Sequence, residues 1–460
     1  MMALLWTGNH RQPATGKKLQ QIINFSIMQI RNYRWIIVSL LFFATTINYI
    51  DRQIIGLLKP ILELEFNWSE KDFAYIVMAF TAAYAIGLLV MGRLIDKIGT
   101  KAGYTLIIVI WSIAGMLHAL ARNALQFALA RFGLGIGEAG NFPAGVKAIS
   151  EWFPKKERGI ATGIFNSGPS VGVVMALLIV PWILNRYSWH EVFWITGGIG
   201  FIWLILWLIF YQIPQKHKWL SKKELELILD KENNGYREKD TDKKPEIKWL
   251  KLFTFPQTWA LITVKGLIDP IFWFFLFWLP SYFSTAYELD LKRPSLELII
   301  IYSATTVGSI LGGYFSSMLI RKGWTVIMAR KTALLLFAVL ELTIILAQYT
   351  TAAWMAVAII SLAVAVHQAW ATNVFTMASD MFPSEAVGSV TGIAGMAGAV
   401  GGILFPLVVG FLLDSYKSAG NLTGGYNLLF TICGLTYLCA WLIIHLLTRK
   451  HSSVTLDELK

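Results

Sequence analysis

The sequence predicts an all-α integral membrane protein with twelve transmembrane helices, arranged as two pseudo-symmetric six-helix halves. Of its 460 residues, 56% are hydrophobic and only 15% are charged, whereas soluble domains carry about 25% charged residues. Mostly apolar windows of about 20 residues, the length that crosses a bilayer as a helix, recur along the chain. A pattern of residues in the first half also returns in the second half.

Each apolar window predicts one transmembrane helix. The first window contains Asp51 and Arg52 toward its end, and the fourth contains Arg131 and Glu138. In order along the chain, the predicted spans are 34–62, 72–95, 102–121, 124–150, 159–186, 191–213, 257–288, 295–320, 329–349, 352–378, 386–414 and 426–448.

An internal repeat relates the two halves. Segment 150–154, Ser-Glu-Trp-Phe-Pro, returns 229 residues later as Ser-Asp-Met-Phe-Pro at 379–383, and the glycine and threonine residues that follow return in the same register. The repeat predicts an N-terminal half over 34–213 and a C-terminal half over 257–449. Parallel halves of this kind place a solute site at their interface, near the midplane of the bilayer.

The segments outside the halves predict the orientation in the membrane. They are an N-terminal extension (1–33), a linker (214–256) and a tail (450–460), and within the linker residues 222–228 form the pattern of a short amphipathic helix. Lys and Arg concentrate in alternate loops and in the linker, so both termini and the linker are expected in the cytoplasm. The net charge of +12 therefore reflects topology, and we expect no nucleic-acid binding.

The loop at 92–101, Gly-Arg-Leu-Ile-Asp-Lys-Ile-Gly-Thr-Lys, resembles the loop signature of the major facilitator superfamily. Its glycines permit a tight turn between helices, and Asp96 can bind a helix N-terminus or a cation. We expect Asp96 and Arg93 to act as a conformational latch; the alternative is an ordinary basic loop. The equivalent loop at 313–323 has no Asp, so the latch is expected to be asymmetric.

The run Gly-Ile-Gly-Glu-Ala-Gly at 135–140 has the glycine spacing of a dinucleotide-binding fingerprint but not its structural context. That fingerprint requires a preceding strand in a βαβ unit, whereas this run lies inside a predicted span, where glycines let helices pack closely. No metal-ligand spacing or nucleophile triad is present either. We therefore expect no cofactor, no metal and no enzymatic activity.

Charged residues within the spans indicate a polar pathway for a charged solute or for protons. Glu138 and Arg131 lie seven residues apart, on one face of the fourth helix. Asp51 and Arg52 lie near the end of the first span. Because a charge at bilayer depth costs at least about 2.5 kcal/mol, such residues are usually functional.

The motifs around these charges resemble the anion:cation symporter branch of the superfamily, and within it the bacterial hexuronate transporters. They are Asn-Tyr-Ile-Asp-Arg at 48–52, the segment from Arg131 to Glu138 with Phe-Pro at 142–143, Lys-Gly-Leu-Ile-Asp-Pro at 265–270, and Ala-Val-His-Gln-Ala-Trp at 365–370. The resemblance implies import of glucuronate or galacturonate with protons by a monomer in the bacterial inner membrane. Two departures are Phe-Trp-Phe-Phe at 272–275, where the group has Trp-Trp-Phe-Tyr, and Pro169, where galactonate transporters have Gln.

The roles of the charged residues are inferred from their chemistry and from this resemblance. Arg52 offers a planar fork that matches the substrate carboxylate; alternatively it pairs structurally with Asp51 or a tyrosine. Asp51 and Glu138 are the expected proton carriers, because burial favours the neutral acid and a nearby Arg favours the anion. Arg131 is expected to hold the deprotonated Glu138, although Glu138 could also be a permanent ion-paired staple.

The remaining site residues are expected to contact the sugar or to gate the path. Lys265 and Asp269, four residues apart, predict a salt bridge, with a gating or second anion role as the alternative. His367 is expected to pack within its helix. The expected sugar contacts are Tyr49, Tyr84, Asn166, Gln368, Trp370 and Asn373.

Two other functions are compatible with these residues. The protein could be another organic-anion symporter of the same branch, for galactonate, glycerate or an aromatic acid. Such a symporter would use the same charged residues and transport a different substrate. A transporter-like membrane sensor would bind the sugar acid and signal through the linker at 214–256.

Overall fold

The computed structural model describes residues 32–68, 70–229, 248–288, 296–448 and 453–459, and all regular structure in them is helical. Most of the predicted N-terminal extension, the middle of the linker and part of the tail lie outside these residues. Ten helices in the described part are long and apolar enough to cross a membrane. The first span, which contains Asp51 and Arg52, and the divided fourth span bring the number of spans to twelve. The predicted fold class is therefore confirmed.

The N-terminal half contains the first six spans, of which the fourth is divided into two helices. Its elements are α2 (Arg34–Phe66), α3 (Glu70–Ile98), α4 (Thr100–Leu117) with the 3-10 turn η1 (His118–Leu120), α5 (Ala124–Ala139), α6 (Asn141–Trp152), α7 (Lys155–Leu184) and α8 (Trp189–Phe210).

The linker contributes short helices, and the C-terminal half repeats the arrangement. The predicted amphipathic helix is present as α9. The elements are η2 (Pro214–Lys216), α9 (Lys222–Leu229), η3 (Trp249–Thr254), α11 (Pro256–Tyr287), α12 (Leu296–Arg321), α13 (Val326–Glu341) followed by the 3-10 helix η4 (Leu342–Tyr349), α14 (Ala353–Met381), α15 (Ser384–Ser418), α16 (Leu422–Leu447) and α17 (Leu456–Leu459).

The fourth span differs from the single helix predicted over 124–150, because α5 ends at Ala139 and α6 begins at Asn141. Pro143 explains the break: it has no N–H for the carbonyl of Ala139, and its ring collides with that carbonyl in a continuous helix. Gly140 allows the close approach at the break, since a Cβ there would lie 2.5 Å from Ile107 of α4.

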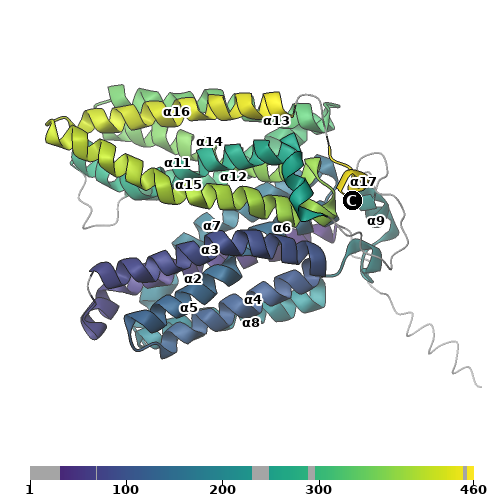
Figure 1. Cartoon of the computed structure of the whole chain (residues 1–460), viewed down its shortest axis with the longest axis horizontal. Coiled ribbons are helices and arrows are strands. Elements are labelled where there is room, and N and C mark those ends of the chain that lie inside the picture. Colours follow the sequence, from purple (N-terminus) through teal and green to yellow (C-terminus); the bar gives the residue numbers. More distant parts are fainter. Residues whose placement is uncertain (1–31, 69, 230–247, 289–295, 449–452, 460) are drawn as a thin grey trace, which may run out of the picture.

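The two halves lie side by side, and α9 and α17 both lie at one end of the bundle, which we call the linker end (Figure 1). Glu224 of α9 accepts hydrogen bonds from the backbone N–H groups of Tyr33 and Arg34, at 2.9 and 3.1 Å. The tail reaches the C-terminal half, because Val454 N–H donates to the carbonyl of Met381 at 2.7 Å.

Glycines bring helices of opposite halves into backbone contact. At the α3–α15 crossing, a Cβ on Gly92 would lie 2.5 Å from the carbonyl oxygen of Gly388. At the α7–α12 crossing, a Cβ on Gly163 would lie 2.5 Å from the carbonyl oxygen of Ser309. These glycines lie in the parts of α3 and α7 nearer the linker end, so the halves are packed tightly there.

Candidate substrate and proton site

The centre of the N-terminal half holds a buried ion pair between α2 and α5. Arg52 binds one carboxylate oxygen of Glu138 through Nε at 3.0 Å and Nη2 at 2.9 Å. The guanidinium also lies over the rings of Tyr49 at 4.5 Å and Tyr84 at 4.7 Å. Glu138 is fully buried, whereas the Arg52 side chain is 13% exposed, so the cation is the accessible member of the pair.

Arg131 does not pair with Glu138 as the sequence suggested. Its Nη2 donates to the backbone carbonyl of Arg52 at 3.2 Å, and its guanidinium lies 5.5 Å from the ring of Phe80. Seven residues along a helix correspond to a rise of about 10 Å, too far for direct contact between these two groups. The cation in direct contact with Glu138 therefore comes from another helix, whereas Arg131 lies within electrostatic range of Glu138 and binds the backbone of α2.

Asp51 points away from Arg52, into the interior of the N-terminal half. It is 3% exposed, and within the described residues neither of its carboxylate oxygens accepts a hydrogen bond that meets ordinary geometry. Thr196 of α8 is one of its polar neighbours. The alternative of a structural Asp51–Arg52 pair is excluded in this conformation, because adjacent helical residues point about 100° apart.

A second ion pair lies in α11 of the C-terminal half. Lys265 and Asp269 are joined at 2.6 Å, which is the predicted salt bridge, and the Asp269 side chain is 23% exposed. Asp269 lies within electrostatic range of Tyr49 and Tyr84 across the interface. A Cβ on Gly398 of α15 would lie 2.1 Å from the Asp269 carboxylate, so that glycine makes room for the acid.

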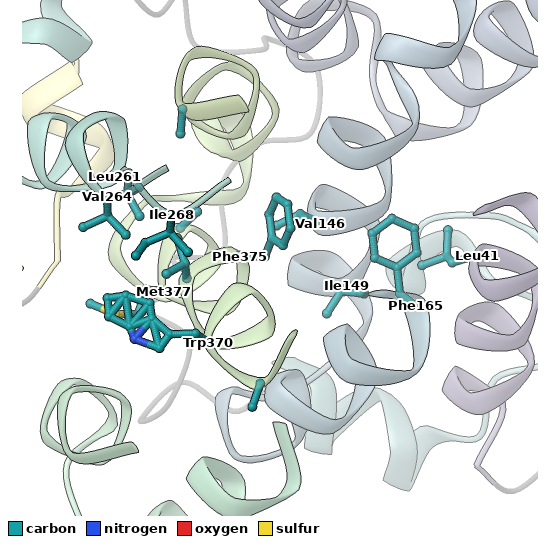
Figure 2. Packing of buried hydrophobic residues seen from close by; sticks show 14 of the residues in the cluster. Leu41, Val146, Ile149, Phe165, Leu261, Val264, Ile268, Trp370, Phe375 and Met377 are labelled. Carbon is teal, nitrogen blue, oxygen red and sulfur yellow. The ribbon is translucent and has the colours of Figure 1, made fainter. Parts of the chain in front are cut away.

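The predicted sugar contacts separate into two groups. Asn166 of α7 donates to Gln368 of α14 at 2.9 Å, a hydrogen bond between the halves. Asn373 instead donates to the carbonyl of Gly312 at 3.0 Å, inside the C-terminal half. Trp370 is fully buried and lies among C-terminal helices, away from the N-terminal half (Figure 2). The structure therefore does not bring Trp370 or Asn373 to the site.

Aromatic residues close the path on the linker side of these charges. Phe142 of α6 stacks on Phe375 of α14 with ring centroids 5.1 Å apart, and Phe165 packs on Phe142 at 5.3 Å. Figure 2 shows Phe375 between the halves, directed toward Val146. The ammonium group of Lys265 lies 4.3 Å from the centroid of the Phe375 ring, so this barrier adjoins the second ion pair.

Asp96 joins α3 to α6 and α15 at the linker end. Its carboxylate binds Lys147 at 2.8 Å and accepts the backbone N–H groups of Gly388 and Ser389 at 3.1 and 2.6 Å. These N–H groups lie in the second turn of α15, which begins at Ser384, so the Asp96 carboxylate joins α3 to α15 directly. Lys147 also donates to the carbonyl of Ser384. Arg93 lies outside this network, 5.7 Å from the ring of Trp249.

A second charged latch, which the sequence analysis did not identify, joins α14 to α7 and α13. Asp380 binds Arg158 at 3.3 Å and Arg330 at 3.0 Å, and all three side chains are nearly inaccessible. Arg158 also donates to the carbonyl of Ser379 at 2.6 Å, and Arg330 to that of Lys155 at 3.2 Å. The latch was expected to be asymmetric because the loop at 313–323 has no Asp. The C-terminal half instead has its acid, Asp380, at the end of the tenth span, within the repeated Ser-Asp-Met-Phe-Pro motif.

Two six-helix halves that enclose buried ion pairs, and that are latched together at one end, define a multi-pass membrane transporter rather than an enzyme. The chain belongs to the Major Facilitator Superfamily, whose family model matches residues 41–406.

Known sugar-acid transporters are similar over most of the chain. A hexuronate transporter of Escherichia coli (strain K12) is 32% identical over 431 residues, covering 94% of this chain and 97% of the relative. A D-galactonate transporter of Escherichia coli O6:H1 is 30% identical, covering 84% and 90%. The solved proton:xylose symporter XylE shares the fold with a TM-score of 0.70 at 17% identity, covering 93% of this chain and 98% of that one.

Proposed function

We propose that this protein imports a hexuronate-type sugar acid, glucuronate or galacturonate, together with protons. The observation that carries the proposal is the buried ion pair of Arg52 and Glu138. A substrate carboxylate competes with Glu138 for the guanidinium fork, because both are planar anions of the same geometry. Glu138, displaced from Arg52 in a buried position, then favours its protonated form. Binding of the sugar acid thereby promotes binding of a proton.

The residues around Arg52 suit a sugar acid. Tyr49 and Tyr84 flank the guanidinium and can present hydroxyl groups to the sugar. Asn166 and Gln368, which bind each other across the interface, would exchange that bond for sugar hydroxyls. Trp370 and Asn373 are left out of this proposed site, because their side chains bind α13 and α12 inside the C-terminal half, whereas Gln368 contacts α7.

Alternating access would follow from rocking one half against the other around this site. With the linker end in the cytoplasm, as the positive-inside rule predicts, the described conformation is closed to the cytoplasm. Release inward would require the latches of Asp96 and Asp380 to open. Both termini would then be cytoplasmic, in a monomer of a bacterial inner membrane.

Asp51 and Glu138 give two possible proton numbers. One proton with one monovalent anion is electroneutral and responds only to the pH difference. If Asp51 also titrates, one net charge moves, which adds about 2.3 kcal/mol per 100 mV. That energy corresponds to roughly fifty-fold more accumulation, so the membrane potential separates the two cases.

The test is uptake of labelled glucuronate into proteoliposomes with and without an inward proton gradient. We expect gradient-driven accumulation that galacturonate competes for and galactonate does not. Glu138→Gln should abolish uphill uptake and retain exchange of labelled for unlabelled glucuronate. Glu226→Gln, which changes an exposed acid of α9, is the matched control and should behave as the wild type.

Two outcomes would replace the proposal. Accumulation of galactonate but of no hexuronate would make the protein an aldonate symporter, a possibility supported by the similar identity of the D-galactonate transporter. Binding of glucuronate without any transport would favour the sensor, with signalling through the linker.

A further inference from the structure

The C-terminal half buries an acid that the proposed mechanism does not use. Glu341, the last residue of α13, is fully buried. Within the described residues neither of its carboxylate oxygens has a hydrogen-bond partner, and no Lys or Arg pairs with it. An ionised carboxylate in this position would cost several kcal/mol. Glu341 is therefore held as the neutral acid, which means that it carries a proton.

The helix geometry changes at this acid. The ninth span is α-helical up to Glu341 and continues as the 3-10 helix η4 from Leu342 to Tyr349. The sequence analysis predicted one continuous span over 329–349. The 3-10 stretch forms the last eight residues of the span Val326–Tyr349. The acid thus lies at the junction of the two helix geometries, within the span.

Other ionisable groups face Glu341 from the helices packed on α13. From α16, the thiol of Cys433 and the hydroxyl of Tyr437 lie within electrostatic range of it. From α14, the Nδ1 atom of His367 is hydrogen-bonded to the Tyr437 hydroxyl at 2.5 Å. From α12, the ring contact with α13 is apolar, with Phe315 packed against Phe337 of α13.

His367 also connects these ionisable groups to the ion pair of Lys265 and Asp269. The His367 ring stacks on Phe272 of α11, with centroids 5.0 Å apart. Lys265 of α11 lies within electrostatic range of His367 and is paired with the partly exposed Asp269 at 2.6 Å. A series of ionisable side chains on α11, α14, α16 and α13 therefore extends from the interface of the halves to Glu341.

The internal repeat gives this series a counterpart in the other half. His367 lies 229 residues after Glu138, the spacing of the repeat, so the two residues hold the same position in their halves. Each contacts the first helix of its own half: Glu138 binds Arg52 of α2, and His367 stacks on Phe272 of α11. Both positions hold a side chain that can bind or release a proton.

We propose that Glu341, Tyr437 and His367 form a second proton-binding site in the C-terminal half, loaded in the conformation closed at the linker end. The proposal rests on the proton coupling proposed above. Release requires a repacking of α13 and α16 that brings Glu341 into hydrogen-bond contact with Tyr437; Tyr437 then accepts the Glu341 proton on its oxygen and gives its own proton to Nδ1 of His367. The products are a Glu341 carboxylate and a His367 imidazolium, so charge and protons balance.

The first test does not depend on transport. In the infrared spectrum of the purified full-length protein near neutral pH, we expect the carbonyl band of a protonated carboxylic acid that is lost in Glu341→Gln. Glu226→Gln, the exposed control on α9, should keep that band. A band unchanged in Glu341→Gln would show that Glu341 is not the proton carrier and would overturn the proposal.

The second test measures coupling in proteoliposomes that accumulate glucuronate. Each coupled proton multiplies the equilibrium accumulation by the proton ratio, so at a tenfold proton ratio Glu341→Gln should accumulate about tenfold less than the wild type. If Glu341→Gln does not fold, Tyr437→Phe, which breaks the link to His367, is expected to show the same loss. Wild-type accumulation in the folded variant overturns the second site, whereas a wild type without proton dependence overturns the proposed function itself.

Discussion

In the N-terminal half, Glu138 is ion-paired with Arg52 of the first helix, whereas His367, at the same position of the repeat in the C-terminal half, is hydrogen-bonded to Tyr437 of the last helix. The backbone around the two positions differs as well. Pro143 divides the fourth span, while α14 runs unbroken through the equivalent position, Thr372. The repeat therefore fixes where each helix lies in its half. Single residues decide whether an equivalent position holds a charged pair or a neutral hydrogen-bonded network.

The two latches differ in the same way. Asp96 is satisfied by one ammonium group and by two backbone N–H groups of α15, which carry only partial charges. Asp380 is satisfied by two guanidinium groups, from Arg158 and Arg330. The latch of the C-terminal half therefore contains more full charge, and its loss leaves more charge uncompensated.

The largest effect is expected for Asp380→Asn. It leaves two buried guanidinium groups without their anion, and breaking a buried pair in this way costs about 3–5 kcal/mol. We expect a marked fall in the yield of folded protein and in the melting temperature in detergent. An Asp380→Asn variant that melts like the wild type would mean that the two arginines are satisfied without the acid.

Arg52→Lys is expected to have the next largest effect, on transport. Lysine keeps the charge and loses the fork, and hydrogen bonds to charged groups are worth about 1.5–3 kcal/mol. The affinity for glucuronate should fall about ten- to hundredfold, as measured by the concentration dependence of uptake. His367→Gln, at the repeat position equivalent to Glu138, should leave that affinity near the wild-type value. An equal loss of glucuronate affinity in both variants would show that the two halves do not differ in how they bind the substrate.

Asp96→Asn should have a smaller effect than Asp380→Asn, because the amide still accepts a hydrogen bond from α15. A loss of about 1–2 kcal/mol would favour the conformation open at the linker end by a factor of about five to thirty. A cysteine introduced at the buried Val146, with Cys433 and Cys439 replaced by Ala, should react correspondingly faster with a maleimide. Unchanged labelling would argue that Asp96 does not hold this end closed.

The smallest effect is expected for Pro143→Ala. It restores the missing N–H and allows α5 and α6 to join as one helix, as in α14, so stability should change by at most about 1 kcal/mol. The melting temperature should stay close to the wild-type value while the rate of glucuronate uptake falls. An uptake rate equal to that of the wild type would show that the break is not used as a hinge.

Much of the fold could be predicted from local sequence. Hydrophobic windows predicted twelve spans, because every backbone group in the bilayer must be hydrogen-bonded within a helix. The amphipathic pattern at 222–228 predicted α9, and the spacing of Lys265 and Asp269 predicted their ion pair. These features depend on neighbours within a few residues, which the sequence displays directly.

The site was predicted less completely, because its contacts join helices that are distant in sequence. The residues Arg52 and Glu138 were identified, but Glu138 was assigned to Arg131 of its own helix. Trp370 was expected at the sugar and faces the interior of its half. Asp380 was visible in the repeated motif, yet its partners Arg158 and Arg330 come from two other spans.

The sequence by itself determined the number of spans, the two halves and the chemical groups available at the centre, since hydropathy and repetition are local properties of the chain. The tertiary structure alone decided which charges are paired, which side of each helix meets the other half, and that Glu341 has no hydrogen-bond partner among the residues that the structure describes. The physical reason is that an ion pair or a buried proton depends on distances between helices, and these are set only when the twelve spans pack together.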